Sequence, residues 1–189
     1  MAEHVCPWWL CYTFDNPLRR LVQDPRAILR PYLTGGQTAL DLGCGMGYFS
    51  LGMACLVGAQ GRVIAVDLQE KMLATLKRRA AKHKVQARIQ TRRCLPDDLG
   101  LDDLRGQVDF ALVFWMLHEV PNQAGFLQQV AASLKSGGRL LIAEPRFHVS
   151  QAAFSAELDL LRDQGWEVLA RPAIWGSHAA LLRLLSQAA

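Results

Sequence analysis

The sequence predicts an α/β fold built on a mostly parallel sheet, and three observations support this. Short apolar runs alternate with longer stretches of helical periodicity, an arrangement typical of a parallel sheet covered by helices. Two of the apolar runs lead into an acid, at Asp41 and at Asp67. The chain has 189 residues, 51% of them hydrophobic, and no internal repeat, which suits a single domain with a sizeable core.

The first elements follow one another closely. The apolar stretch Ala39–Leu42 predicts a buried strand, and a helix is expected from about Tyr48 to Val57. Gly58 follows that helix, where glycine commonly ends one. The stretch Arg62–Val66 predicts a second buried strand that stops at Asp67.

The middle of the chain continues the alternation. A helix is expected from about Gln69 to His83, and a short strand at Ala87–Gln90. A loop containing Pro96 then leads to a strand at Val108–Phe114.

The last part of the chain predicts two helices and three strands. Pro121-Asn122 is expected to open a helix that Gly137-Gly138 ends, before a strand at Arg139–Ala143. A final helix carries Phe154, Leu158 and Leu161 on one face and ends at Gly165. Two more strands are expected near Trp166–Ala170 and Ala179–Leu185.

Three glycines at alternate positions follow the first strand, in Asp41-Leu42-Gly43-Cys44-Gly45-Met46-Gly47. Glycines let the backbone approach a ligand, and the helix that follows directs free N–H groups at it. A dinucleotide-binding loop has the spacing G-x-G-x-x-G, but here the third glycine comes one residue early and Asp41 would repel a diphosphate. The pattern resembles the cofactor loop of class I S-adenosylmethionine-dependent methyltransferases.

This resemblance covers about Leu29 to Leu185 and implies a Rossmann-like three-layer sandwich, with a seven-stranded, mostly parallel sheet whose last strand is antiparallel. It implies S-adenosylmethionine as the cofactor, with its methionine part held at the glycine loop and its ribose at Asp67. Relatives often have an acid for the adenine after the third strand; this chain has none there, so the backbone of Cys94 or Leu95, or Asp97 reaching back, is expected to replace it. The implied cofactor-binding residues are Asp41, Gly43, Cys44, Gly45, Gly47, Asp67, Leu68, Met72, Cys94, Leu95, Phe114 and Trp115.

The segment after the fourth strand, Trp115-Met116-Leu117-His118-Glu119, resembles one found in small-molecule methyltransferases. His118 is the candidate catalytic base, because its pKa ordinarily lies near neutrality; the alternative is a structural role beside Trp115. Secondary candidates follow the fifth strand, where ordinary loop solvation is the competing interpretation: Glu144, Arg146 and His148. His178 is expected in a hairpin, in a structural role.

Residues 1–28 form an N-terminal segment outside the expected methyltransferase domain, which spans residues 29–189. Four of its aromatic residues fall within seven positions, from Trp8 to Phe14. We expect them to form a lid, with Tyr12 near the transferred methyl group, or to pack on the sheet edge or on a second subunit of a homo-oligomer. Cys6 and Cys11 lack the further ligands typical of a metal site, so no metal is expected.

The sequence therefore predicts a methyltransferase that acts on a small molecule. The net charge of +4 is mild, and the basic stretch from Lys77 to Arg93 is interpreted as a solvated helix face rather than a nucleic-acid site. The chain shows no signal peptide or membrane span, and five scattered cysteines suggest reduced thiols, so a cytoplasmic location is expected. Two alternatives remain: a non-catalytic S-adenosylmethionine-binding regulatory subunit, and an RNA methyltransferase that uses the basic stretch.

Overall fold

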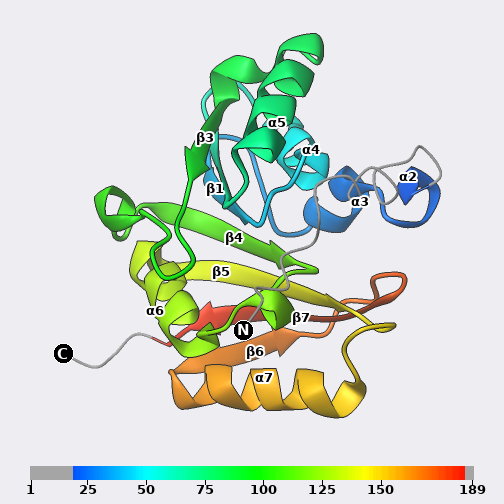
Figure 1. The fold of residues 1–189 in the computed structure, drawn as a ribbon, viewed down its shortest axis with the longest axis vertical. Coiled ribbons are helices and arrows are strands. Elements are labelled where there is room, and N and C mark those ends of the chain that lie inside the picture. Colours follow the sequence, from blue (N-terminus) through cyan, green and yellow to red (C-terminus); the bar gives the residue numbers. More distant parts are fainter. Residues whose placement is uncertain (1–18, 186–189) are drawn as a thin grey trace.

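The structure, a computed structural model, describes residues 19–185 (Figure 1). Its strands form one sheet in the order β3-β2-β1-β4-β5-β7-β6. Strands β1 to β5 pair in parallel, and β7 is antiparallel to both of its neighbours. This confirms the predicted seven-stranded sheet with an antiparallel last strand. The strands are β1 (Thr38–Leu42), β2 (Arg62–Asp67), β3 (Ile89–Arg93), β4 (Val108–Phe114), β5 (Leu134–Pro145), β6 (Trp166–Ala170) and β7 (Ser177–Leu184).

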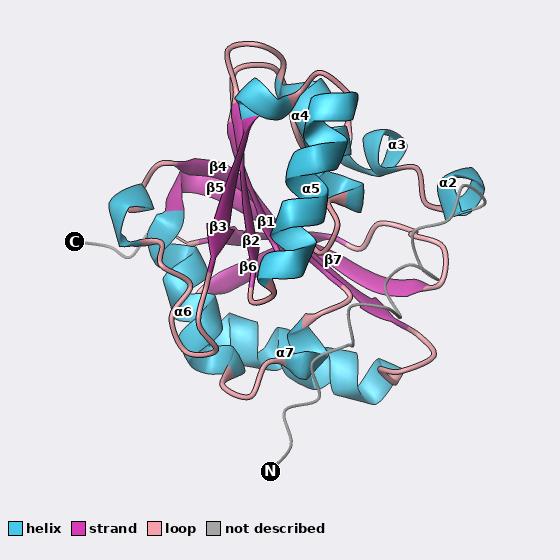
Figure 2. Ribbon diagram, turned by 45° about the horizontal axis from the view of Figure 1, so that its top comes forward, coloured by secondary structure: helices cyan, strands magenta, loops and turns pink. Residues whose placement is uncertain are grey.

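Helices cover both faces of the sheet, as predicted for a three-layer sandwich. Figure 2 shows α4 and α5 on one side and α6 and α7 on the other. Of the helices in the described residues, none is both long and apolar enough to cross a bilayer. The α-helices are α2 (Arg19–Val22), α3 (Pro25–Leu29), α4 (Tyr48–Val57), α5 (Glu70–Lys82), α6 (Gln123–Ser133) and α7 (Gln151–Asp163).

The central strands separate two hydrophobic cores. Successive side chains of a strand point to opposite faces, so Leu40 and Leu42 pack with α6 and α7, whereas Ala39 packs with α3 and α4. By the same alternation Asp41 faces α4. Both cores need apolar residues, which explains why the buried parallel strands are almost continuously hydrophobic.

The predicted end of α6 was wrong. The helix ends at Ser133, and Gly137-Gly138 lie inside β5. Val108 of β4 pairs with Leu134, whereas Phe110 pairs with Arg139, so the residues between loop out of the ladder. The two glycines therefore belong to an irregularity of the strand, which local sequence does not distinguish from a helix end.

Two strand boundaries also differ from the prediction. A 3₁₀ helix occupies Gln86–Arg88, and the third strand starts at Ile89. As an edge strand it is rich in polar side chains, which weakens its sequence signal. The last strand starts at Ser177, so His178 lies in a strand opposite Glu144 and not in a hairpin turn.

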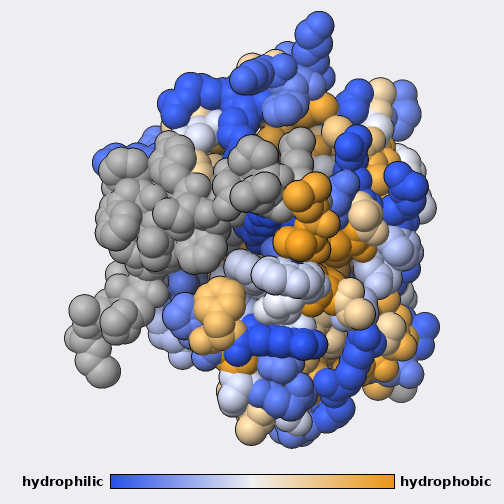
Figure 3. Space-filling view, turned by 90° about the vertical axis from the view of Figure 1, so that its right-hand side faces the viewer, coloured by the Kyte–Doolittle hydropathy of each residue, from blue (hydrophilic) through white to orange (hydrophobic). Residues whose placement is uncertain are grey.

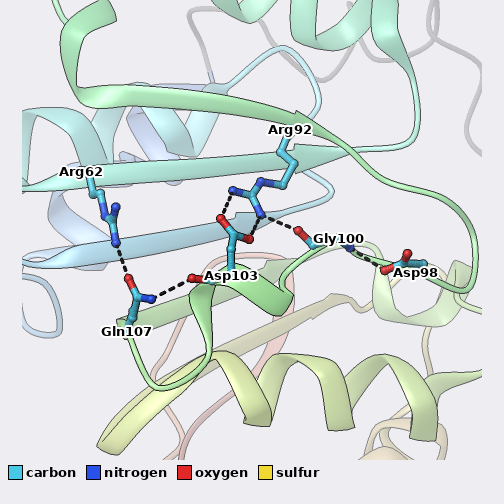
Figure 4. Close-up of polar contacts among 6 residues, drawn as sticks. All are labelled: Arg62, Arg92, Asp98, Gly100, Asp103 and Gln107. Carbon is cyan, nitrogen blue, oxygen red and sulfur yellow. Dashed lines mark hydrogen bonds and ion pairs between the residues drawn. The ribbon is translucent and has the colours of Figure 1, made fainter.

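A polar network holds the connection from β3 to β4 (Figure 4). Arg92 forms two hydrogen bonds with the Asp103 carboxylate, of 2.6 and 3.0 Å, and also donates to the Gly100 carbonyl. Arg62 donates to Gln107, which in turn donates to the Asp103 carbonyl. The network joins β2 and β3 to the segment before β4, and so fixes both ends of the loop around Cys94.

Candidate active site

The glycine loop connects the end of β1 to the start of α4. The Cys44 N–H donates to the Val66 carbonyl at 3.0 Å, and the Gly45 N–H donates to Asp67 Oδ2 at 2.8 Å. Both bonds fasten the loop to the end of β2. The resemblance implied that both segments hold one cofactor, and they lie together because the carboxyl ends of neighbouring parallel strands share one edge of the sheet.

The three glycines of the loop are needed for different reasons. A β-carbon on Gly43 would come within 2.9 Å of Met116 Cγ, and one on Gly47 would overlap the Leu76 side chain. A β-carbon on Gly45 would meet no atom of the described residues within 4 Å. Of these three glycines, Gly45 faces open space as far as the described residues go, and the other two permit close packing within the protein.

Asp41 lies buried beneath the loop. Its Oδ2 accepts a hydrogen bond from the Ser50 hydroxyl of α4, and 3% of the residue is exposed. Burial raises the pKa of Asp41 to about 7, although the Ser50 hydrogen bond opposes this shift. The sequence placed this acid beside the loop, but it did not reveal Ser50 as its partner.

Asp67 joins the loop to the start of α5. Its Oδ1 accepts from the Gln69 N–H and its Oδ2 from the Gly45 N–H, both at 2.8 Å. Burial raises the pKa of Asp67 above its usual range. Next to it, Leu68 packs against one core and Met72 is buried in α5.

The interpretation of the basic stretch from Lys77 to Arg93 as a solvated helix face was wrong for Arg79. Its guanidinium donates to the Met46 carbonyl in the glycine loop at 2.9 Å. Several other cations of the stretch also have internal partners: Arg78 donates to the Thr75 hydroxyl, Arg88 donates to the Ala54 carbonyl, Arg92 pairs with Asp103, and Arg93 lies 3.8 Å from Glu70.

The loop after β3 does not offer the free backbone donors that were expected for an adenine. The Cys94 N–H donates to the Asp67 carbonyl at 3.1 Å, and the Leu95 N–H donates to the Asp98 carbonyl at 2.8 Å. Burial raises the pKa of the Cys94 thiol to about 11 and also raises the pKa of the Cys44 thiol well above its usual range. Both thiols are therefore protonated at neutral pH and poorly nucleophilic.

Trp115 turns the chain sharply at the end of β4. Its φ of 59° lies in the left-handed region, which bulky residues rarely adopt. Its indole N–H donates to the Ser177 hydroxyl at 2.8 Å. Rings in contact lead from α4 past this residue toward the candidate base, in the order Phe49, Phe114, Trp115, Phe147, His148 and His118.

His118 is paired with a buried carboxylate. Its Nδ1 is hydrogen-bonded to Glu144 Oε2, while the Leu117 N–H donates to Glu144 Oε1 at 2.9 Å. Glu144 is fully buried, so the expectation of loop solvation was wrong for it. The hydrogen bond from Glu144 raises the pKa of His118, and burial of the imidazole opposes this shift. An acid that directly follows an apolar strand was a usable signal here, as it was for Asp41 and Asp67.

The remaining candidates have structural contacts. Arg146 donates to the Ser177 carbonyl at 3.0 Å, and the His178 ring stacks on Phe154 at 5.6 Å. His148 stacks on the His118 ring at 5.9 Å. Phe147 is 61% exposed next to these groups.

Residues 19–23, which comprise α2 and the residue after it and belong to the N-terminal segment expected outside the methyltransferase domain, contact both halves of this region. The Tyr48 hydroxyl donates to the Gln23 carbonyl at 2.9 Å, and the Gln23 amide donates to the Trp175 carbonyl at 2.7 Å. The Arg19 guanidinium lies 4.4 Å from the Tyr48 ring centroid and 4.9 Å from that of Trp115. Tyr12, Cys6, Cys11 and the other aromatic residues of the expected lid lie outside the described residues.

Figure 3 shows the molecule from the side toward which the arrowhead of β4 points in Figure 1. Hydrophobic residues gather near the middle of this face.

The candidate active site has two parts. The glycine loop, Asp67 and the open space above Gly45 fit a cofactor that carries an amino group and a ribose, and the pair formed by His118 and Glu144 can accept a proton.

Comparisons with known proteins identify the family of this chain. The family described as a methyltransferase domain matches residues 33–178. The chain is 30% identical to the ubiquinone biosynthesis O-methyltransferase of Marinobacter nauticus over 171 residues, which cover 86% of this chain and 68% of that protein. It is 33% identical to the demethylmenaquinone methyltransferase of Shouchella clausii, over 58% of this chain and 45% of that one.

Among solved structures, an S-adenosylmethionine-dependent methyltransferase from Aquifex aeolicus has a TM-score of 0.85. The match covers 96% of this chain and 100% of that one at 22% identity. At this identity the likeness shows the shared fold. With several curated relatives the aligned region is less than half of the relative's length.

Proposed function

Since this chain belongs to the family of class I S-adenosylmethionine-dependent methyltransferases, we propose that its acceptor is a small aromatic molecule whose hydroxyl group loses its proton to His118. The observation that carries the proposal is the hydrogen bond between the half-buried His118 and the fully buried Glu144, at the edge of the sheet where the glycine loop also lies. The names of the two relatives, which refer to ubiquinone biosynthesis and to demethylmenaquinone, support an acceptor with a planar ring.

The cofactor half of the site uses residues that the sequence identified. The open space above Gly45 accepts the ligand, Asp67 is the candidate ribose acid, and Asp41 adds an acid beneath the loop. When bound, S-adenosylmethionine supplies an activated methyl group, so the protein mainly has to position the acceptor and exclude water.

The acceptor half supplies the proton acceptor. Glu144 accepts the hydrogen bond from Nδ1 of His118, which leaves Nε2 as the nitrogen that can take a proton from an acceptor hydroxyl. Transfer of one methyl group to a hydroxyl oxygen releases one proton, and His118 receives it. The exposed ring of Phe147, in contact with Trp115, offers a flat apolar surface for an aromatic acceptor.

The two alternative functions have less support. An RNA methyltransferase would need its basic stretch free for phosphates, but Arg79, Arg88 and Arg92 have partners within the protein. A regulatory subunit without turnover would have no use for an imidazole paired with a buried carboxylate.

Substitution of the base provides the test. We expect His118→Ala to lower turnover of a small phenolic acceptor by about 100-fold or more, because general base catalysis contributes on that scale. The affinity for S-adenosylmethionine should stay within about twofold, since His118 makes no contact with the glycine loop. Turnover is measured as release of S-adenosylhomocysteine and affinity by calorimetric titration.

The exposed His83, at the end of α5, gives the matched control, and His83→Ala should change neither quantity. Turnover of His118→Ala within threefold of the unsubstituted protein would show that His118 is not the base. An equal loss of turnover and of thermal stability would indicate a structural role.

A further inference from the structure

A second buried carboxyl, Glu157, lies behind the candidate base and has no assigned role. It sits on the inner face of α7 with Phe154, Leu158 and Leu161, and 8% of the residue is exposed. Its Oε2 is buried without a hydrogen-bond partner among the described residues. Buried carboxyls are rarely left in this state, because desolvation of a charge is costly unless it is compensated.

The fold places this carboxyl beside Glu144. Glu144 and His178 are opposite each other in the β5–β7 ladder, so their side chains emerge on the same face of the sheet. The His178 ring stacks on Phe154 of α7, and Glu157 follows Phe154 by three positions, on the same face of that helix. The β-strand pairing and the helix periodicity therefore bring both carboxyls to the same side of β5.

The groups around Glu157 come from several elements. Glu144 of β5 and His118 after β4 act on its charge, while His178 of β7 and His148, stacked on His118, lie next to them. Burial and the negative charge of Glu144 raise the pKa of Glu157 to about 7. The charge of Glu157 in turn helps to raise the pKa of His118, along with Glu144 and Glu119.

We propose that Glu157 is a positioning residue for the methyl-transfer reaction, which sets the pH range in which the pair of His118 and Glu144 accepts a proton. This inference rests on the proposed role of His118 as the base. When His118 takes the proton of the acceptor, its new positive charge favours ionisation of Glu157. The proton gained at the imidazole is then balanced by loss of the Glu157 proton to solvent, so the net charge of His118, Glu144 and Glu157 together does not change.

The test is Glu157→Gln, which removes the charge at nearly constant shape. We expect the titration midpoint of His118, followed by NMR of its labelled ring nitrogens, to fall by about half a pH unit. The acid limb of the profile of kcat/KM against pH should move down by the same amount. A merely structural role would lower the rate without moving either midpoint.

The matched control is Asp159→Asn, a charge removal on the exposed face of the same helix, which should leave both midpoints unchanged. The reciprocal measurement follows the Glu157 carboxyl carbon in His118→Asn; its midpoint should rise, because the two charges act on each other equally. This measurement also stands if Glu157→Gln fails to fold.

A midpoint of His118 that is the same in Glu157→Gln and Asp159→Asn would overturn the proposal. The proposal would also be overturned if Glu157→Gln moved the titration midpoint of His118 in the NMR measurement but left the acid limb of kcat/KM against pH unchanged. Failure of the proposed function is distinguishable from both, because it appears as retained turnover in His118→Ala while the NMR coupling persists.

Discussion

Asp67 joins three parts of the site through one carboxylate. It accepts hydrogen bonds from the glycine loop and from the turn into α5, and it ends β2. We predict that Asp67→Ala weakens binding of S-adenosylmethionine at least tenfold, or by about 1.4 kcal/mol, in a calorimetric titration. Asp163→Asn, which removes an exposed acid of α7, serves as the control and should bind normally. Unchanged affinity in Asp67→Ala would refute the assignment of this acid.

Gly45 and Gly47 are two positions apart but should respond differently to alanine. Both have positive φ, of 52° and 84°, so each substitution costs about 1 kcal/mol of backbone strain. At Gly47 the new methyl group also overlaps Leu76, so Gly47→Ala should lower the melting temperature more. At Gly45 the methyl group enters the open space, so Gly45→Ala should lower cofactor affinity more. Equal effects of the two substitutions on both quantities would contradict this division.

At the scale of elements, helix α5 supports the glycine loop from outside the sheet. Arg79 reaches from the last turns of the helix to the Met46 carbonyl, whereas the neighbouring Arg78 donates to Thr75 of its own helix. We predict that Arg79→Ala weakens S-adenosylmethionine binding by about threefold to tenfold, because the loss of one charged hydrogen bond leaves the loop less ordered. Arg78→Ala removes the same charge and should have no such effect.

Salt-dependent RNA binding gives an independent readout for the same pair. If the basic stretch bound RNA, Arg78→Ala and Arg79→Ala would weaken RNA binding to the same extent. Our proposal expects no such common effect on RNA binding.

The whole molecule should lose stability as the pH rises from acid to neutral. Burial raises the pKa of Asp41 from 3.8 to about 7 and that of Glu157 from 4.5 to about 7, so the folded chain binds protons more tightly than the unfolded chain. The stabilisation is complete below the unfolded pKa values and is lost as the pH approaches 7. The raised pKa of His118 acts in the same direction, at higher pH.

We therefore expect the melting temperature without cofactor to be several degrees lower at pH 8 than at pH 5, and Asp41→Asn to reduce this difference by about 3 °C or more. Asp163→Asn is again the control. A melting temperature that rises between pH 5 and pH 8, or an Asp41→Asn protein with the same pH dependence as the parent, would contradict the raised pKa of Asp41.

The sequence by itself determined the order of elements and the position of the cofactor loop. Apolar runs of strand length, helices ended by glycine and acids that follow strands are local signals, so β1, β2, β4 and α4 were predicted nearly residue for residue. The glycine spacing and Asp67 indicated the cofactor for the same reason. Where several chain segments decide the conformation, as in the irregular pairing of β4 with β5, the local signal of Gly137-Gly138 was misleading.

Only the tertiary structure decided which groups are partners. Glu144 meets His118 from 26 positions away, and Arg79 meets Met46 from 33 positions away. The backbone donors of Cys94 and Leu95 are taken by oxygens of Asp67 and Asp98. A sequence shows which side chains can donate or accept, but the partner of each depends on which strand ends and loops the sheet order brings together. The same juxtaposition buries Asp41 and Glu157, and burial raises the pKa of both carboxyls.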